Sequence, residues 1–435
     1  MMKLHNAAAL AACLAAGWAA PVHADAVTDW HAIAVQCIAV APAPASLGGR
    51  SAPANLLDLA LVQAAVHDAV QAIEHQYEPY LARPPANGDE APAAAAAAAA
   101  YRVLLKVCPH VVPTLDAAFA PYLAGNDAGL AVGYAAADAL IAVYRPAVTL
   151  PGFTGGTNPG EWRPTPPALA PMANLYVAAN VKPFTFDDPA MFRPAPPPAL
   201  TSKIYAKDYN EVKATGSVQS HPAAATCPGP RKTDLARFWS GNFAALWNDT
   251  VRQIAVDQQL SLGETARLLA LTSLAAADAG IAVWDSKLHY DFWRPITAIN
   301  LGDTDGNPAT APDASWTPFI QGPQFAAGSQ TPPYPDYVSG ANGLTGAFVT
   351  TLQLFFRTDR LDFEIYKATP PAVAICTNPR TYRKLSDAAQ EVVDARILLG
   401  IHFRTADVEA RRLGTRVAFW AFTTTLRPVR EHEHH

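Results

Sequence analysis

Residues 261–295 read SLGETARLLALTSLAAADAGIAVWDSKLHYDFWRP, and this stretch decides the fold class. Ser261 followed by Glu264 three residues later is a capping-box signature, which marks the start of a helix. The apolar residues that follow predict one long helix through residue 292. The chain shows no alternation of strands and helices and no internal repeat of about 20–50 residues, so we predict an all-α, bundle-like fold.

Helical patterns also cover most of the remaining chain. Apolar residues recur with a period of about 3.6 residues over 54–74, and the alanine run at 93–100 is typical of a buried or half-buried helix. Proline and glycine recur over 146–198, which predicts an extended segment wrapped over the helical body, and 301–335 is predicted as a loop. The alanine run continues as one helix through residue 107, and further helices are expected over residues 115–120, 128–144, 201–213, 233–255, 340–357, 384–402 and 405–421.

The composition suits a large folded core. Of the 435 residues 50% are hydrophobic and only 16% are charged, and the formal net charge is −5 at pH 7. A mildly acidic chain without basic runs is a poor candidate for nucleic-acid binding. We predict a single helical domain over 25–435, made of N-terminal helices and wrap (25–200), the helices of the candidate site (201–421) and a tail (422–435). The apolar helical surfaces are compatible with a homodimer.

The first residues have the pattern of a secretory signal peptide over 1–24. A basic start, an Ala/Leu-rich run and the small residue Ala24 predict cleavage before Asp25. No later apolar stretch approaches the roughly 18 uninterrupted residues that a membrane span needs. We therefore predict an exported protein without a membrane span, periplasmic or secreted.

The cysteine content is consistent with export. One of the five cysteines, Cys13, lies in the predicted signal peptide, which leaves Cys37, Cys108, Cys227 and Cys376. In an oxidising compartment this set suits two disulfides, and all three connectivities remain open. The cysteine spacing fits no zinc-binding pattern, so we expect no metal bound through sulfur.

Three short blocks of basic and small residues carry the candidate site. They are Lys287-x6-Arg294-Pro295, Ser339-Gly340 within the run Tyr334-Pro-Asp-Tyr-Val-Ser-Gly, and Arg396-x5-His402. Lys and Arg neutralise negative charge, and Arg binds two oxygens at once. Glycine lets the backbone approach closely, and an imidazole attacks or ligates a central atom. Together the blocks supply the groups that hold a tetrahedral oxyanion.

The spacing of the first block predicts its geometry. In a regular helix, seven residues return to within about 20° of the same face. Trp284, Lys287 and Arg294 would then point into one cleft, and Pro295 would end the helix. Taken alone, a Lys and an Arg at this spacing are better explained as part of a solvated helix face.

The other two blocks have equally plain alternatives. Ser339 and Gly340 would begin a helix, whose free N–H groups and dipole favour an anion, although a serine at a helix start is also a common N-cap. Arg396 and His402 lie six residues apart, about 120° round a helix, and would flank a ligand. A lone histidine in a helix more often has a structural role, so a ligand role for His402 depends on the presence of all three blocks.

The ordered trio resembles the vanadium-dependent haloperoxidase and type 2 phosphatidic acid phosphatase superfamily, whose blocks are Lys-x6-Arg-Pro, Pro-Ser-Gly-His and Ser-Arg-x5-His. The resemblance implies an all-α haloperoxidase and acid phosphatase type of fold over nearly all of the predicted mature chain. It extends to Trp284, Trp293, Gly400-Ile-His-Phe-Arg404 and Gly414, and, as in the bacterial branch, to Asp29-Trp30-His-Ala-Ile-Ala, the run from Tyr205 to Lys213, and Phe238-Trp239.

One departure from the family pattern concerns the chemistry directly. Where the family has its acid/base histidine after Ser-Gly, this chain has Ala341, and an alanine side chain cannot transfer a proton. Val338 replaces the usual proline and Ala395 the usual serine. The oxyanion-binding residues are therefore expected to be intact, whereas the proton-transfer residue is missing.

The resemblance implies a role for each matching residue. His402 would ligate vanadium, and the vanadate (or phosphate) oxygens would be held by Lys287, Arg294, Ser339, Gly340 and Arg396. Trp284 and Tyr334 would lie on the halide side, and Arg404 and Asp407 would orient the site from outside. The implied substrates are hydrogen peroxide and a halide, with a reaction impaired or altered by the loss of the histidine.

Two further functions remain open at this point. A phosphatase of the same superfamily would use His402 as the nucleophile that forms a phosphohistidine, and its substrate would be a phosphoester. Such an enzyme normally needs an acid for the leaving group, which Ala341 cannot supply. The third function is non-catalytic, in which the site binds vanadate or phosphate without turnover.

Overall fold

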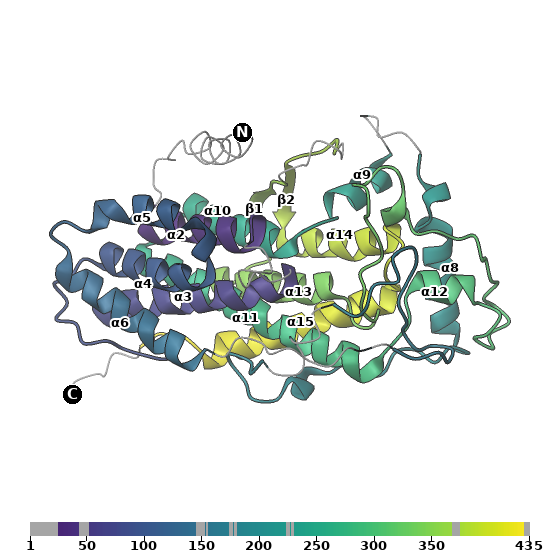
Figure 1. Ribbon diagram of the computed structural model, residues 1–435, viewed down its shortest axis with the longest axis horizontal. Helices are drawn as coiled ribbons and strands as arrows, with labels where there is room; N and C mark the ends of the chain where they lie inside the picture. Colours follow the sequence, from purple (N-terminus) through teal and green to yellow (C-terminus); the bar gives the residue numbers. More distant parts are fainter. Residues whose placement is uncertain are drawn as a thin grey trace, which may run out of the picture.

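The computed structural model describes residues 25–42, 52–144, 153, 155–173, 177, 181–222, 227, 230–367 and 375–429. The predicted signal peptide and the last residues of the chain lie outside this set. Helices dominate the described part, as predicted, and pack side by side into an elongated bundle (Figure 1). A two-stranded antiparallel sheet, β1 (Arg360–Ile365) with β2 (Arg380–Lys384), was not expected from the sequence.

The N-terminal helices occupy one end of the bundle (Figure 1). The seven alanines from Ala94 to Ala100 are all buried, because their small side chains let α4 pack closely between α3 and α6. The elements of this end are α2 (Ala26–Ala34), the π-helical η1 (Val35–Val40), α3 (Ala52–Glu74), α4 (Pro92–Val107), η3 (Pro109–Val111), α5 (Val112–Phe119), η4 (Ala120–Tyr122) and α6 (Asp127–Val143).

The central helix α11 joins this end to the other, because it packs against α3 as well as against α13 and α15. At Gly414 of α15 an added Cβ would lie 2.0 Å from the carbonyl oxygen of Gly343, so glycine permits the close contact with α13. The remaining elements are η5 (Pro189–Phe192), α8 (Lys203–Thr215), η6 (Val218–Ser220), α9 (Arg231–Phe238), α10 (Phe243–Asp257), α11 (Leu262–Tyr290), α12 (Pro295–Asn300), η7 (Phe319–Gln321), α13 (Gly340–Phe356), β1 (Arg360–Ile365), β2 (Arg380–Lys384), α14 (Leu385–Leu398) and α15 (Arg404–Thr424).

The long helix predicted over 261–292 is α11, which begins where predicted and ends two residues earlier than predicted. Both halves of the capping box at Ser261 are present. The helix stops at Tyr290, because Asp291 takes a left-handed conformation (φ 45°) and its carbonyl accepts a hydrogen bond from Trp162. Pro295 begins α12 and does not end α11, so Arg294 is the N-cap of α12. The prediction that Lys287 and Arg294 share one face of one helix was therefore wrong.

Two other predicted helices are interrupted. The segment 233–255 divides into α9 and α10, and Asn242 caps the second helix with its side chain. The segment 384–402 ends at Leu398, since Gly400 has a φ of 76°, a conformation that favours glycine. His402 lies in the loop that follows, so the predicted angle of 120° between Arg396 and His402 does not apply.

The Pro/Gly-rich segment wraps along α11 as expected, over its described residues. Backbone N–H groups of Phe184 and Thr185 donate to the carboxylate of Asp278 in the middle of α11. Further along, Arg193 forms an ion pair with Asp285 at 2.5 Å. The segment therefore fixes the C-terminal half of α11, the part that carries Trp284 and Lys287.

Two disulfides form, as the cysteine content predicts. Cys37 pairs with Cys108, and Cys227 pairs with Cys376. The structure thus selects one of the three connectivities that the sequence left open.

Two helices, Asn55–Glu74 and Leu262–Tyr290, are long and apolar enough by length and composition to cross a membrane, which the sequence reading did not anticipate. A third candidate arises if the bent pair Pro92–Val107 and Pro109–Tyr122 is taken as one span. In each of the first two, the apolar window of 18 residues is entirely buried inside the protein, so its apolar side chains form part of the core of the bundle.

Candidate oxyanion-binding site

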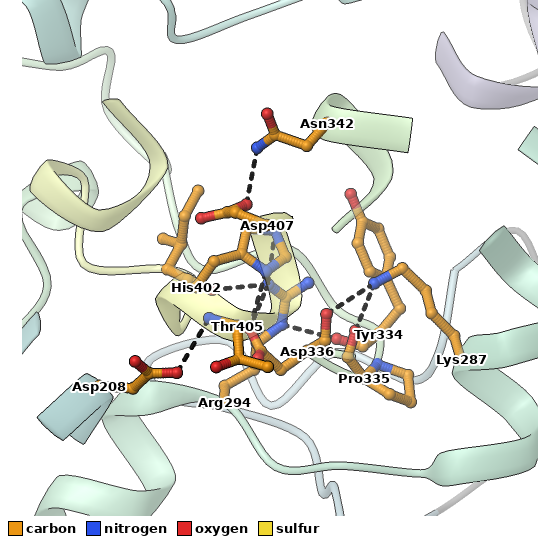
Figure 2. Close-up of polar contacts among 11 residues, drawn as sticks. Asp208, Lys287, Arg294, Tyr334, Pro335, Asp336, Asn342, His402, Thr405 and Asp407 are labelled. Atoms are coloured by element: carbon orange, nitrogen blue, oxygen red, sulfur yellow. Dashed lines mark hydrogen bonds and ion pairs between the residues drawn. The ribbon is translucent and has the colours of Figure 1, made fainter. Parts of the chain in front are cut away.

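The residues of the three sequence blocks converge at the end of α11 that is remote from the N-terminal helices. Lys287 comes from α11, Arg294 from the N-cap of α12, Arg396 from α14 and His402 from the loop before α15. The loop 334–339 runs among them and ends in Ser339, the N-cap of α13. Figure 2 shows Lys287, Arg294, Tyr334 and His402 directed toward one another.

Lys287 and Arg294 both hold the loop 334–339. Lys287 Nζ donates to the carbonyl oxygens of Pro335 (2.6 Å) and Asp336 (3.2 Å), and Arg294 Nε donates to that of Tyr334 (2.7 Å) (Figure 2). The two cations also lie 5.0 Å and 4.9 Å from the centre of the Tyr334 ring. Because an ammonium group has three donors, Lys287 keeps one for a ligand.

His402 is oriented by a carboxylate that the sequence reading missed. Its Nδ1 lies 2.7 Å from Oδ1 of Asp336, and its Nε2 lies 3.2 Å from Nη1 of Arg294. With Asp336 ionised, Nδ1 carries the hydrogen, and the lone pair of Nε2 accepts a hydrogen bond from Nη1 of Arg294. Asp336 lies inside the second block and is fully buried, and its place between Tyr334 and Ser339 was the available signal.

Ser339 and Arg396 reach the cluster from α13 and α14. The Ser339 hydroxyl makes no capping hydrogen bond to its own helix, so the plain N-cap interpretation does not hold. The nearby carboxylate of Asp407 accepts a hydrogen bond from Asn342 at 2.8 Å (Figure 2). Arg396 donates one long bond of 3.3 Å, from Nη1 to the carbonyl oxygen of Trp239.

At their ordinary protonation states, the side chains of this cluster carry more positive than negative charge. Its buried ionisable groups are the cations Lys287, Arg294 and Arg396 and the carboxylates Asp336 and Asp407. The formal excess is one positive charge (3 − 2 = 1), with His402 neutral. A bound anion would balance this excess. A purely structural network of buried charges would be expected to balance its charges without a ligand.

Burial governs the protonation of the cluster. Burial lowers the pKa of Lys287 well below its usual value, with a further contribution from Arg294. The same causes lower the pKa of His402, which keeps the imidazole neutral. Burial raises the pKa of Asp336, against Arg294 and Lys287, and raises that of Asp407 to about 7, against smaller effects of Ser339 and Arg396.

Within this cluster, two guanidinium N–H groups have no acceptor among the described residues. They are Nη2 of Arg294 and Nε of Arg396, both buried. Leaving such a donor unpaired costs about 1–3 kcal/mol, and more for a charged group. Unpaired donors on two of the three cations indicate that an acceptor belongs between them.

A small cavity of about 120 Å³ adjoins the cluster. Of the predicted site residues, Trp284, Tyr334, Gly340 and Arg396 line this cavity, whereas Lys287, Arg294, Ser339 and His402 are buried and do not. Ala341 lines it too, so the position of the missing acid/base histidine faces the cavity.

The other residues that the sequence singled out lie around this cluster. Arg404 forms ion pairs with Glu211 of α8 and Asp394 of α14, so it fixes the start of α15. Asp208 of α8 accepts a hydrogen bond from the backbone of Thr405 (Figure 2). Among the described residues there is no group of three or more His, Cys, Asp or Glu arranged to hold a metal ion.

Comparisons with known proteins show what the sequence and the fold resemble. Residues 267–431 match the family described as the VCPO second helical-bundle domain. Vanadium chloroperoxidase from Curvularia inaequalis is 27% identical over 191 residues, which are 37% of this chain and 29% of that protein. The chain therefore matches less than a third of the length of this curated relative.

Solved structures resemble the chain over most of its length. A bacterial vanadium-dependent iodoperoxidase superposes with a TM-score of 0.73 at 22% identity and covers 95% of this chain and 99% of its own. A bacterial vanadium-dependent chloroperoxidase in the apo form gives a TM-score of 0.67 at 17% identity, with 85% and 92% covered. The chain therefore has the fold of these proteins, and its residues 267–431 are similar to the second helical-bundle domain of the vanadium chloroperoxidase family.

Proposed function

We propose that this protein binds vanadate in the cluster and uses hydrogen peroxide to oxidise a halide. The observation that carries the proposal is the excess of buried positive charge, together with the unpaired N–H groups of Arg294 and Arg396. The names of the relatives, which are vanadium-dependent peroxidases, favour vanadate over other tetrahedral anions.

The residues present fit an oxyanion of this kind. Arg294 and Arg396 each offer an unpaired donor, and Lys287 retains one. Ser339 and the N–H groups at the start of α13 add neutral donors near the positive end of a helix dipole. These groups would hold the vanadate oxygens, and phosphate has the same shape and would bind in the same place.

His402 would be the one protein ligand to vanadium, through Nε2. Asp336 accepts the hydrogen of Nδ1 and so fixes the ring and raises the basicity of the other nitrogen. Bound vanadate would supply a Lewis acid that activates peroxide toward a halide without a change of metal oxidation state. Trp284 and Tyr334 line the cavity of about 120 Å³ and would shape the entry of halide.

Ala341 limits the proton transfer that the site performs. It lines the cavity, and no imidazole occupies that position to accept a proton from peroxide. We propose that peroxide deprotonation is slow in this protein, whereas vanadate binding does not depend on the missing group. Ala341→His is expected to raise the rate of halide oxidation by at least tenfold, consistent with the contribution of about 10²–10⁴ made by general acid–base groups.

Phosphoester hydrolysis is a second candidate, favoured by one observation. Because Asp336 holds Nδ1 of His402, the lone pair of Nε2 is oriented as a nucleophile for phosphorus as well. Without an acid at Ala341, such an enzyme would hydrolyse aryl phosphates, whose leaving groups are already acidic, much faster than alkyl phosphates.

The deciding experiment is peroxide-dependent bromide oxidation by the purified protein, with and without orthovanadate, beside a His402→Ala variant. Activity that requires vanadate and is lost in the variant supports the proposal. Hydrolysis of an aryl phosphate without bromide oxidation would favour the phosphatase. Tight vanadate binding with neither activity would identify a non-catalytic oxyanion-binding protein.

We also propose that the protein is exported. The signal-peptide pattern of residues 1–24 supports this, as do the two disulfides, which persist in oxidising compartments. Amino-terminal sequencing of the protein from its native host should begin at Asp25, and an intact Met1 on cytosolic protein would contradict export.

A further inference from the structure

The two disulfides differ in their exposure to solvent. Cys37 and Cys108 are both buried, whereas Cys227 is exposed and Cys376 is half-buried. An exposed disulfide is open to thiol–disulfide exchange, which a buried one resists. The Cys227–Cys376 disulfide is therefore the one whose state follows the redox conditions around the protein.

This exposed disulfide joins two segments that meet at α9. Cys227 precedes α9 in the chain, and Cys376 precedes β2. The backbone N–H of Cys376 donates to Oδ1 of Asp234, in the first turn of α9, at 2.5 Å. Oδ2 of the same buried carboxylate accepts a hydrogen bond from Arg380 of β2 at 3.0 Å. The disulfide and one carboxylate together hold the β2 segment against the start of α9.

The contacts continue from β2 to the end of α9. Nη1 of Arg380 donates to Oε2 of Glu391 in α14 at 3.1 Å, and the same oxygen accepts from the indole Nε1 of Trp239 at 3.3 Å. Trp239 is the C-cap of α9 and is fully buried. Both α9 and β2 pack against α14 (Figure 1). An unbroken series of contacts therefore runs from the disulfide to Trp239.

The residue that follows β1 by two positions holds the same end of α9. Nζ of Lys367 donates to the carbonyl oxygen of Arg237 at 2.8 Å and also to that of Ser240. The backbone of Lys367 is paired with the side chain of Asn378, at 3.0 Å and 2.7 Å. Because Asn378 lies two residues after Cys376, the chain beside the disulfide contacts both ends of α9.

Arg396 stands at the end of this series. Within the described residues its one hydrogen bond goes from Nη1 to the carbonyl oxygen of Trp239, at 3.3 Å, and its guanidinium lies 5.5 Å from the centre of the Phe243 ring. Arg294, by contrast, donates to two carbonyl oxygens, both at 2.7 Å. The position of Arg396 therefore depends on where the break between α9 and α10 lies, and that of Arg294 does not.

We propose that the Cys227–Cys376 disulfide positions Arg396 for oxyanion binding, so that the disulfide form of the protein binds vanadate more tightly than the dithiol form. This inference rests on the proposed function, which places vanadate in the cluster. Without the disulfide, hydrogen bonds alone hold the β2 segment to α9. The end of α9 then moves more freely, and the unpaired Nε of Arg396 faces the anion for less of the time.

This dependence would couple oxyanion binding to export. When the disulfide forms, each thiol gives up one electron and one proton, and the disulfide of a thiol–disulfide exchange protein accepts them and becomes a dithiol. The cytosol keeps thiols reduced, whereas disulfides form and persist in exported proteins. The exported chain would therefore be the tight-binding form, and the chain before export would bind vanadate weakly.

Calorimetric titration with orthovanadate tests the proposal. Joint replacement Cys227→Ser and Cys376→Ser should raise the Kd about fivefold, within the range of about 2–30-fold that changes along a coupling network produce. The matched control is Cys37→Ser with Cys108→Ser, which removes the disulfide at the N-terminal end of the bundle. The control should keep the Kd within about twofold of the wild type, because its substitutions share no partner with the cluster.

A double-mutant cycle separates the positioning of Arg396 from a general effect on folding. In an Arg396→Met background, the serine replacements at Cys227 and Cys376 should change the Kd by less than about twofold, because the side chain through which they act is absent. An equal loss of affinity in both backgrounds would show that the disulfide does not act through Arg396 and would overturn the proposal.

Selective reduction replaces the serine variant if that variant does not fold. The wild type is treated with a phosphine reductant, alkylated with iodoacetamide and desalted before titration, and peptide mapping should show Cys227 and Cys376 alkylated and the buried pair intact. The Kd should again rise about fivefold, and hydrogen exchange over residues 231–241 should become faster. An unchanged Kd would overturn the positioning role alone. Absence of orthovanadate binding to the disulfide form would refute the proposed function and this inference together.

Discussion

Two places in the helical core bury charge in opposite ways. In α3 and α11 the carboxylates of Asp68 and Asp278 each accept three hydrogen bonds, from the loop after α3 and from the wrapped segment respectively. At the far end of α11, Arg294 and Arg396 are just as buried but keep unpaired N–H groups. A satisfied buried charge holds segments together, whereas an unsatisfied one destabilises the protein unless a ligand completes it.

The largest effect on stability should come from removal of the Asp278 carboxylate, which accepts three hydrogen bonds. Asp278→Ala leaves the N–H groups of Phe184 and Thr185 and the Thr185 hydroxyl without their acceptor, so we expect a loss of about 3 kcal/mol in the free energy of unfolding. Urea denaturation measures this loss. Asp187→Ala is the control, because that side chain is 91% exposed and should change stability by less than about 0.5 kcal/mol.

Removal of a charged side chain from the oxyanion cluster should affect stability less than the loss of Asp278 does. Arg396→Met takes away one of the three buried cations, so the free energy of unfolding should stay within about 1 kcal/mol of the wild type or increase. The affinity for orthovanadate should fall about 10–100-fold, because charged hydrogen bonds contribute about 1.5–3 kcal/mol. Calorimetry and urea denaturation test both parts.

The control for this variant is Arg412→Met, whose side chain is 68% exposed. It should change neither the free energy of unfolding nor the affinity for orthovanadate. A fall of several kcal/mol in the stability of Arg396→Met, with unchanged affinity for orthovanadate, would show that Arg396 is structural and would remove the contrast between the two sites.

Asp336→Asn should distinguish ligation from simple charge attraction. Loss of the carboxylate weakens the hold on His402, so the affinity for orthovanadate is expected to fall about tenfold, within the range seen for groups that orient a metal ligand. Phosphate forms no bond to His402 on binding, and the added positive charge should leave its affinity unchanged or higher. Equal losses for both anions would argue against ligation by His402, and ¹⁵N NMR should report a changed tautomer.

The smallest effect concerns the pH dependence of stability. Burial raises the pKa of Asp278 to about 7, against the hydrogen bonds from Phe184 and Thr185. In the unfolded chain the pKa of an aspartate is about 3.9, so between these values the folded state binds more protons and stability falls as pH rises. From pH 6 to 7.5 this group should remove about 1 kcal/mol. Urea midpoints in Asp278→Asn should show a smaller pH dependence, and an identical one would refute the shift.

Much of the fold could be predicted because its signals are local. The capping box at Ser261, the alanine run at 93–100 and the 3.6-residue periodicity over 54–74 each depend on neighbouring residues, and the helices there form as expected. The pair of disulfides followed from the number of cysteines, but their connectivity required the fold.

The errors at the site have a tertiary origin. The break after Tyr290 depends on Asp291 adopting a left-handed conformation and accepting a hydrogen bond from Trp162, which lies far away in the sequence. Arg294 still reaches the cluster, but from the N-cap of α12. Spacing therefore identified the correct residues for a partly incorrect geometric reason, and Asp336 was missed because no spacing rule includes it.

The central claim is that the buried cluster is built to hold a tetrahedral oxyanion, and calorimetric titration of the wild-type protein with orthovanadate tests it most directly. We predict one saturable site per chain, displaced by phosphate and weakened at least tenfold in His402→Ala. Absence of binding at millimolar orthovanadate, in protein shown to be folded, would contradict the claim.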